Sequence, residues 1–214
     1  MFSQKASPLS SLRKPSDADL AAAIELRPAT RADVPALDAL HFLSVQALGA
    51  ADYSPAQIEA FIGHLGTYDK QLIDDGTYFV LIHGGHLVGS GGWSRRRPYA
   101  PREQAGVEPE GERLQAGSLA PDSAPDSAKL RSIFVHPKYA RLGLGSRLVR
   151  HAEAEAAAAG FRLVELWATL TGVPLYAKLG YQEVGAFDIP VGWITAVPAM
   201  HMARILTAGE ASAA

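Results

Sequence analysis

The sequence predicts one α/β domain built on a mixed, mostly antiparallel sheet with helices on both of its faces. Two β-rich runs, residues 77–82 and 86–93, flank Gly84-Gly85, and a glycine pair at that spacing is typical of a hairpin. The later segment 129–168 alternates strand, helix and strand, as a crossover connection does. No internal repeat suggests a second domain. The predicted order is strand, two helices, three strands, helix, strand, helix and two strands.

The first half of the chain carries signals for one strand and two helices. Residues 24–27 read as a short strand that a proline closes. Thr30 has an acid three residues later, which is a helix start, and apolar residues then recur at helical spacing as far as Leu48. Ser54-Pro55-Ala56-Gln57 is a stronger start signal. The helix that follows it presents on one face Ile58, Phe61, Ile62 and Leu65.

The remaining segments read as loops, ends and a closing hairpin. Residues 94–127 are rich in proline and repeat Ala-Pro-Asp-Ser, and a loop of this length is either functional or disordered. We expect it to be a mobile segment that overhangs a substrate site. A hairpin after Tyr181 ends with a strand near 197–206. A flexible extension at 1–20 and a flexible tail at 207–214 leave 21–206 as the single domain.

Composition excludes several classes of protein. The chain has 214 residues, 48% hydrophobic and 20% charged, which is ordinary for a globular domain. Its net charge of −2 provides no basic field, so no nucleic acid or membrane partner is expected. The absence of cysteine excludes disulfides, thiolate metal ligands and a cysteine nucleophile. No apolar run approaches the roughly 20 residues that span a bilayer, and no signal-peptide core is evident, so the expected location is the cytoplasm.

A glycine-spaced turn separates the strand at 129–135 from an alanine-rich helix. Its glycines are Gly143 and Gly145, and a turn of this kind leaves backbone N–H groups unpaired at the positive end of the helix dipole. Such a turn is a binding site for a phosphate group. It lacks the third glycine of a dinucleotide fingerprint and the lysine of a P-loop, so NAD and nucleoside triphosphates fit poorly.

Three short motifs together resemble the GCN5-related N-acetyltransferase (GNAT) family. They are Ile-Phe-Val-His-Pro at 133–137, Arg-Leu-Gly-Leu-Gly-Ser-Arg-Leu at 141–148 and Pro-Leu-Tyr-Ala-Lys-Leu-Gly-Tyr at 174–181. In element order the resemblance covers roughly 24–206. It implies a GNAT-like sheet with a splayed strand pair, acetyl-CoA as the acetyl donor, an amine as the acceptor and no metal.

The resemblance also implies which residues hold the cofactor. The backbone N–H groups of the turn would bind the CoA pyrophosphate, and they belong to Arg141, Leu142, Gly143, Leu144, Gly145 and Ser146. The strand edge at Ile133, Phe134 and Val135 would pair with the pantetheine amides, because a splayed strand offers unpaired N–H and C=O groups. An N–H near Phe134 or Val135 would polarise the thioester. Thr169 stands where many members carry asparagine, and Ala140 stands where arginine or glutamine is usual.

Tyr176 is the predicted catalytic residue and also a predicted cofactor contact. It lies where the family's tyrosine protonates the departing thiolate. A phenol with a pKa of about 10 is a reasonable donor to a thiolate of about 8.5 once both are shielded from water. The alternative is a buried aromatic ring whose hydroxyl caps a backbone group. Tyr181, in contrast, is expected to pack.

No general base is predicted. The strand before the turn offers Lys129, Arg131 and Ser132, and none of these is a convincing base. Glu165 on the next strand is expected to be solvated or salt-bridged, and His136 to be structural. Other residues have two readings, as acceptor-site walls or as ordinary packing or surface residues: His41, His64, Trp93 and Trp167. Arg95-Arg96-Arg97 reads as solvated surface more than as a site for an acidic substrate.

The function that these observations favour is N-acetyl transfer from acetyl-CoA to a primary amine by direct attack, since no cysteine can form an acyl-enzyme. A small molecule or a peptide would supply the amine. The alternative is an acyl-CoA-binding sensor or regulatory module without effective catalysis. The hairpin at the C-terminus offers an edge for a homodimer.

Overall fold

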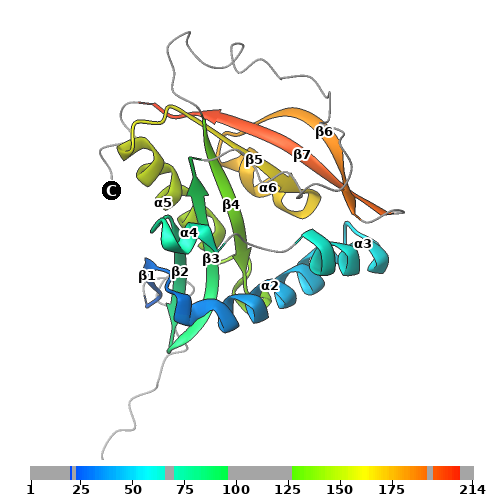
Figure 1. Cartoon of the computed structure of the whole chain (residues 1–214), viewed down its shortest axis with the longest axis horizontal. Coiled ribbons are helices and arrows are strands. Elements are labelled where there is room, and N and C mark those ends of the chain that lie inside the picture. The colour runs from blue at the N-terminus through cyan, green and yellow to red at the C-terminus, as the bar shows by residue number, and fades with distance from the viewer. Residues whose placement is uncertain (1–19, 21–22, 66–69, 96–126, 192–194, 208–214) are drawn as a thin grey trace, which may run out of the picture.

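A computed structural model describes residues 20, 23–65, 70–95, 127–191 and 195–207 (Figure 1). Seven strands form one sheet in the order β1-β2-β3-β4-β5-β7-β6. The strands are β1 (Glu25–Pro28), β2 (Tyr78–His83), β3 (His86–Ser94), β4 (Ala128–Val135), β5 (Leu163–Thr169), β6 (Gln182–Val191) and β7 (Thr195–Ile205). Only β4 and β5 pair in parallel, so the predicted mixed, mostly antiparallel sheet is confirmed.

Helices cover both faces of this sheet, as predicted. They are α2 (Val34–Gly49), α3 (Pro55–Ala60), α4 (Gln71–Asp74), α5 (Leu144–Ala158) and α6 (Val173–Lys178), with a π-helical turn at Phe61–Leu65 and short 3-10 turns at Arg31–Asp33, Pro137–Tyr139 and Leu170–Gly172. Alternate residues of β2 show the two faces: Phe79 packs in the cluster that includes α5 and α6, whereas Tyr78 and Val80 pack against α2 and α4.

The local signals read from the sequence are confirmed. Gly84 and Gly85 both have a left-handed backbone, with φ of 55° and 79°, as a tight hairpin between β2 and β3 requires. The Thr30 N–H donates to the Asp33 carboxylate at 2.7 Å. Ser54 and Gln57 cap each other reciprocally at the start of α3. Helix α4 was not predicted, because four residues are too few to show a helical period.

The strands β4 and β5 separate soon after they pair. Their only pairs among the described residues are Ala128 with Val164 and Lys129 with Glu165. Beyond these pairs β4 has a bulge, where Ser132 takes a left-handed φ of 52° and the register with β3 shifts. A bulge bends its strand and increases the twist, so β4 leaves β5 (Figure 1). The structure therefore contains the splayed pair that the resemblance implied.

Several expectations fall on residues that the structure does not describe. These are the extension at 1–19, the tail at 208–214, the loop at 96–126 and the side chain of His64. The first and last strands lie within two residues of their predicted bounds. Within the described ranges, no helix combines the length and the apolar character that crossing a membrane would require.

Candidate active site

The predicted phosphate turn forms the N-terminus of α5. Gly143 caps the helix with a left-handed φ of 79°, and the first bond of the helix is donated by the Arg147 N–H to the Gly143 carbonyl at 3.0 Å. The amides of Leu144, Gly145 and Ser146 precede that bond, so they have no acceptor inside the helix. Arg141 also has a left-handed backbone, with φ of 68°, which is uncommon outside glycine. The turn therefore presents backbone donors at the positive end of a 15-residue helix.

Gly145 also leaves room beside this turn. A Cβ atom at residue 145 would come within 3.0 Å of the Leu175 side chain on α6. The position lies on the wall of a cavity, and a side chain there would fill part of the space between α5 and α6. The space that Gly145 leaves therefore connects the donor-rich turn with the cavity.

The strand edge that was predicted to bind the pantetheine arm lies on the open side of β4. Phe134 and Val135 pair with Ser90 and Gly89 of β3, on the side away from β5. Because β5 has already diverged, the other edge of β4 faces the opening. An extended segment carrying amides would fit such an edge as an added strand. Ile133, Phe134 and Val135 all line the cavity that begins there.

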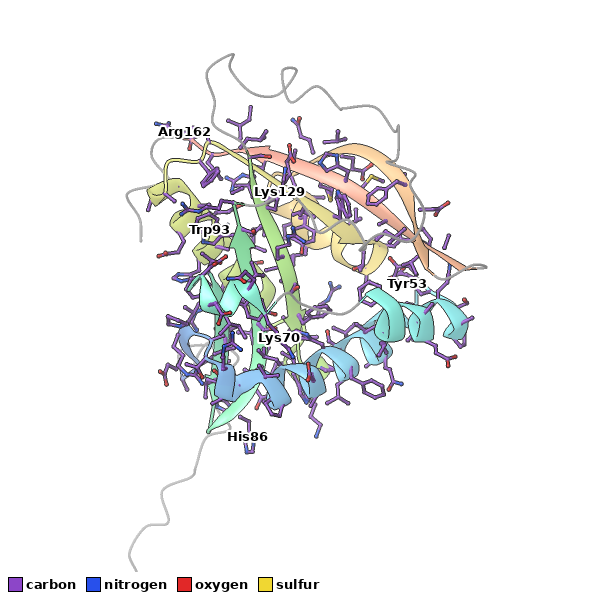
Figure 2. All side chains as sticks on the ribbon, viewed as in Figure 1. Tyr53, Lys70, His86, Trp93, Lys129 and Arg162 are labelled. Carbon is purple, nitrogen blue, oxygen red and sulfur yellow. The ribbon has the colours of Figure 1, made fainter. Side chains whose placement is uncertain are left out.

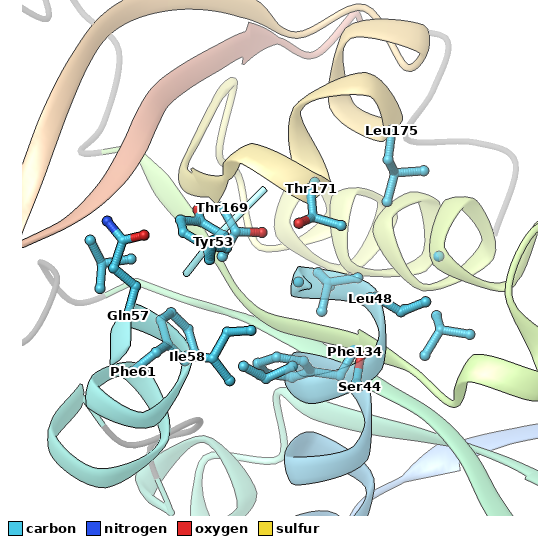
Figure 3. Close-up of a pocket in the computed structure, with 17 residues that line it drawn as sticks. Ser44, Leu48, Tyr53, Gln57, Ile58, Phe61, Phe134, Thr169, Thr171 and Leu175 are labelled. Atoms are coloured by element: carbon cyan, nitrogen blue, oxygen red, sulfur yellow. The ribbon is translucent and has the colours of Figure 1, made fainter. Parts of the chain in front are cut away.

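A cavity of about 170 Å³ occupies this opening. One wall comes from α2, α3 and the segments after them, and includes Leu48, Tyr53, Ile58 and Phe61 (Figure 3). The opposite wall comes from the end of β5, the turn after it and α6, and includes Thr169, Thr171, Gly172 and Leu175. Helix α2 contacts β3 and β4 while α3 contacts β7, so the two helices bridge both sides of the opening.

Tyr176 lies directly behind this second wall. Its ring is 8% exposed and packs edge-on against Tyr181 at 5.7 Å between centroids. A Cβ atom at Gly172 would lie 3.1 Å from Cε2 of Tyr176, so the tyrosine ring backs the cavity at that glycine. Burial raises the pKa of the Tyr176 phenol, which keeps its proton on the oxygen. Tyr176 is not itself a lining residue of the cavity, so its neutral phenol lies behind the wall that Gly172 forms.

Tyr181 packs in the core, as expected. It is 4% exposed, and its hydroxyl donates to the Glu153 carboxylate at 2.8 Å. The same carboxylate oxygen accepts a bond from Arg204 at 2.9 Å. Tyr181 is therefore committed to a buried polar group away from the cavity.

Glu165 is salt-bridged, which confirms the structural reading of this residue. Its carboxylate binds the Lys129 ammonium and lies 3.8 Å from Nε2 of His201. Burial alone would raise the pKa of Glu165, but the nearby His201 ring and the hydrogen-bonded Lys129 ammonium lower it to about 2. Glu165 sits at the closed end of the strand pair, where β4 and β5 are still hydrogen-bonded. An ionised and bonded carboxylate at that place is a poor base for the cavity.

The histidines and Trp93 near the site have structural roles. His41 is fully buried, its Nε2 lies 2.8 Å from Ser90 Oγ, and burial lowers its pKa to about 3. His136 accepts the Lys138 N–H at 3.1 Å and so caps a short turn. Trp93 is 3% exposed and packs edge-on against Phe161. Trp167 is 51% exposed and packs against Phe187, and it does not line the cavity.

A buried polar network lies under the bulge of β4. The Tyr78 hydroxyl is 3.2 Å from the Ser132 carbonyl oxygen and 3.1 Å from Ser90 Oγ. The ring of His41, which also binds Ser90, stacks on Phe134 with 4.2 Å between centroids. Through these contacts, side chains of α2, β2 and β3 pack beneath Ser132, the residue at the bulge of β4. The network therefore supports the bend that opens the site.

Sequence reasoning missed the contribution of α2 and α3 to the cavity. Ile58 and Phe61 were expected on the apolar face of a helix, and they instead line the opening. Tyr53 was not singled out; its hydroxyl donates to the Pro198 carbonyl at 2.8 Å and accepts the Leu170 N–H at 2.7 Å. The one available signal was the strong capping box at Ser54, which marks where the second helix begins.

The comparisons with known proteins identify the class to which this fold belongs. The model of the Acetyltransferase (GNAT) family matches residues 46–181, which is more than half of the chain. The chain therefore belongs to the GNAT family of acetyltransferases, and the resemblance read from the three motifs is confirmed. No curated protein sequence matches the chain significantly.

Solved structures share this fold at low sequence identity. A GCN5-related N-acetyltransferase from Rhodopseudomonas palustris is 20% identical, with a TM-score of 0.61 over 85% of this chain and 95% of its own. The PaiA N-acetyltransferase from Thermoplasma acidophilum, solved in complex with coenzyme A, is 18% identical, with a TM-score of 0.56 over 86% and 99%. A ribosomal-protein-alanine N-acetyltransferase from Brucella melitensis is 19% identical, with a TM-score of 0.53 over 85% and 99%.

Proposed function

We propose that this protein transfers the acetyl group of acetyl-CoA to a primary amine within one ternary complex. The observation that supports this most directly is the alignment of three features around one opening. These are the donor-rich turn at 141–146, the free edge of β4 at 133–135 and the cavity between them. A relative with the same fold, PaiA, was solved with coenzyme A.

The binding roles follow from the geometry of the backbone. The amides from Arg141 to Ser146 would hold the pyrophosphate, because they lie at the positive end of α5 and those of Leu144, Gly145 and Ser146 have no acceptor inside the helix. The edge of β4 at Ile133, Phe134 and Val135 would pair with the pantetheine arm. Thr169, at the end of β5, supplies a hydroxyl on the opposite side of the opening.

The bound cofactor would supply an acetyl group activated as a thioester. An N–H of β4 at Phe134 or Val135 would donate to its carbonyl oxygen, where negative charge develops. The amine nitrogen forms the new C–N bond as the C–S bond breaks, and the electron pair of that bond stays on sulfur. Tyr176 would give its proton to this sulfur, and the proton lost by the amine would restore the phenol through water. With no cysteine in the chain, the transfer needs no cysteine acyl-enzyme.

The test is release of free thiol from acetyl-CoA in the presence of a panel of primary amines, combined with calorimetry of CoA binding. Amine-dependent thiol release is the expected result. Tight CoA binding without release for any amine would instead support the sensor. Failure to bind CoA at millimolar concentration would contradict both functions.

A further inference from the structure

The described walls of the cavity carry no ionised side chain. The polar residues among them are neutral ones, namely Ser44, Tyr53, Gln57, Thr169 and Thr171, and the others are apolar or glycine. We propose that the part of this cavity between α2, α3 and β7 is the acceptor site, and that it accepts a primary monoamine whose body is a single ring or a branched alkyl group. This inference rests on the acetyl transfer proposed above.

Two of the neutral polar side chains of the wall, Tyr53 and Gln57, are already bonded to the protein. The Tyr53 hydroxyl donates to Pro198 and accepts from Leu170, and burial raises the pKa of this phenol. The Gln57 side chain donates to the Ala196 carbonyl at 3.0 Å and accepts the Ser54 N–H at 3.0 Å. These bonds engage the Tyr53 hydroxyl and the Gln57 amide, so the surface that an acceptor meets is mainly apolar and is formed by Leu48, Ile58, Phe61 and Val197. The first three of these are labelled in Figure 3.

Among the described residues, the ionisable side chains nearest the cavity are not part of its lining. Asp52 is exposed and reaches the wall through Thr171, whose hydroxyl donates to its carboxylate at 2.6 Å. His41 lies behind Phe134, where burial lowers its pKa to about 3. Burying an ion without a counter-charge is strongly unfavourable. The second ammonium of a diamine or the carboxylate of an amino acid would therefore be rejected.

An apolar wall also favours the reactive form of the acceptor. Desolvation lowers the pKa of an amine, so the nitrogen enters as a free base with its lone pair available. This accounts for a cavity with no carboxylate or free histidine among its described lining residues. The amine then needs only to lose its second proton to water as the C–N bond forms.

The size of the cavity limits the body of the acceptor. An apolar protein cavity of about 150 Å³ binds benzene, and the cavity here measures about 170 Å³. That volume is an upper limit for the acceptor, because the thioester end of the cofactor would share the cavity along β4. At most one aromatic ring or a branched alkyl group fits beside it, and a long polyamine does not.

The test compares three primary amines that differ in charge. Phenethylamine has an apolar ring, phenylalanine adds a carboxylate to the same skeleton, and putrescine carries a second ammonium. We expect kcat/KM for phenethylamine to exceed that of the other two by about tenfold or more, because their extra charges find no partner in the wall. A preference for phenylalanine or putrescine would overturn the inference and leave acetyl transfer intact.

A pair of variants tests whether the wall sets this preference. Ile58→Asp places a carboxylate in the cavity, and Leu43→Asp places one on an α2 residue that is 44% exposed. Ile58→Asp should lower the ratio of phenethylamine to putrescine kcat/KM by about tenfold, since a carboxylate pairs with the second ammonium. Leu43→Asp should leave the ratio unchanged. An unchanged ratio in Ile58→Asp would overturn the inference, provided that its Tm and CoA affinity show a folded protein.

A binding experiment separates the two proposals. If no amine supports thiol release while CoA binds, acetyl transfer fails, and calorimetry of each amine against the CoA complex then decides the class of ligand. Tighter binding of phenethylamine than of putrescine would support the apolar acceptor site. Equal or weaker binding would overturn it.

Discussion

The two ends of the β4–β5 pair have opposite chemistry. At the closed end, the Lys129 ammonium of β4 pairs with the Glu165 carboxylate of β5, and His201 of β7 lies 3.8 Å from the same carboxylate. Lys129 is labelled in Figure 2. At the open end, Phe134 and Thr169 face a cavity whose described lining residues are uncharged. The comparison shows that the two ends of one strand pair have different roles. At one end a pair of charges joins the strands, and at the other end the strands separate around a cavity with uncharged described walls.

The largest effect is expected at the open end, from Tyr176→Phe. Loss of the phenolic proton should lower kcat by about 100-fold, which is typical of a missing general acid. The affinity for acetyl-CoA should change little, because the ring still packs behind Gly172. Steady-state kinetics and calorimetry measure the two quantities.

Tyr181→Phe is the matched control for Tyr176→Phe, since both rings are buried in the same cluster. It removes a hydrogen bond to Glu153 and should lower stability without a comparable loss of kcat. Equal losses of kcat in the two variants would show that Tyr176 has only a packing role.

A substitution at the closed end should lower the stability of the protein and leave kcat unchanged. Glu165→Gln removes one partner of a half-buried pair and should cost about 2 kcal/mol in the free energy of unfolding at neutral pH. The folded-state pKa of Glu165, about 2, lies below its ordinary value, so its contribution is present above that ordinary value and is lost as the pH falls toward 2. Urea unfolding at several pH values should therefore show the gap between wild type and variant narrowing in acid. A constant gap from neutral pH to pH 3 would contradict this assignment.

Gly143→Ala tests the role of the turn at the start of α5 in binding CoA. A non-glycine residue at a φ of 79° is strained by about 1 kcal/mol, and relief of that strain would shift the amides of the turn. Affinity for CoA should fall by roughly tenfold, because several backbone donors lose alignment together.

Gly160→Ala is the control for the phosphate turn. Gly160 follows the other end of α5, and its φ of 94° imposes a similar strain. This variant should lose comparable stability and keep its affinity for CoA. A loss of CoA affinity in Gly160→Ala as large as that in Gly143→Ala would show that the effect is one of stability.

The smallest effect is expected from Tyr78→Phe, under the bulge. Removing its hydroxyl leaves the Ser132 carbonyl without that buried contact, at a cost of about 1 kcal/mol. If the contact supports the bend, KM for acetyl-CoA should rise a few-fold while kcat at saturation is kept. Ser90→Ala breaks the same network without touching the bulge carbonyl, so a rise in KM confined to Tyr78→Phe would support a positioning role.

Local features of the site were readable from the sequence because their causes are local. Gly143 and Gly145 determine the backbone of the turn, and Ser54 determines where α3 begins. The same is true of the hairpin at Gly84 and Gly85. Helix α4 was missed because its buried residues, Leu72 and Ile73, show no period in so short a segment.

The walls of the cavity were not readable in this way, since they are assembled from distant parts of the chain. Tyr53 and Pro198 are bonded across 145 residues. Ile58 and Phe61 look like core residues in any helical pattern, and only the separation of β4 from β5 leaves a cavity in front of them. Periodicity shows that a side chain is apolar and on one face, but not what lies opposite it.

By itself, the sequence determined the order of the strands and of the longer helices, the glycine turn before α5 and the family, because glycine spacing, caps and alternation act within a few residues. The tertiary structure decided which carboxylate forms a salt bridge, which tyrosine lies behind the cavity and which described residues line it. Those outcomes depend on a bulge in β4 that separates two strands, and on contacts between residues far apart in the chain.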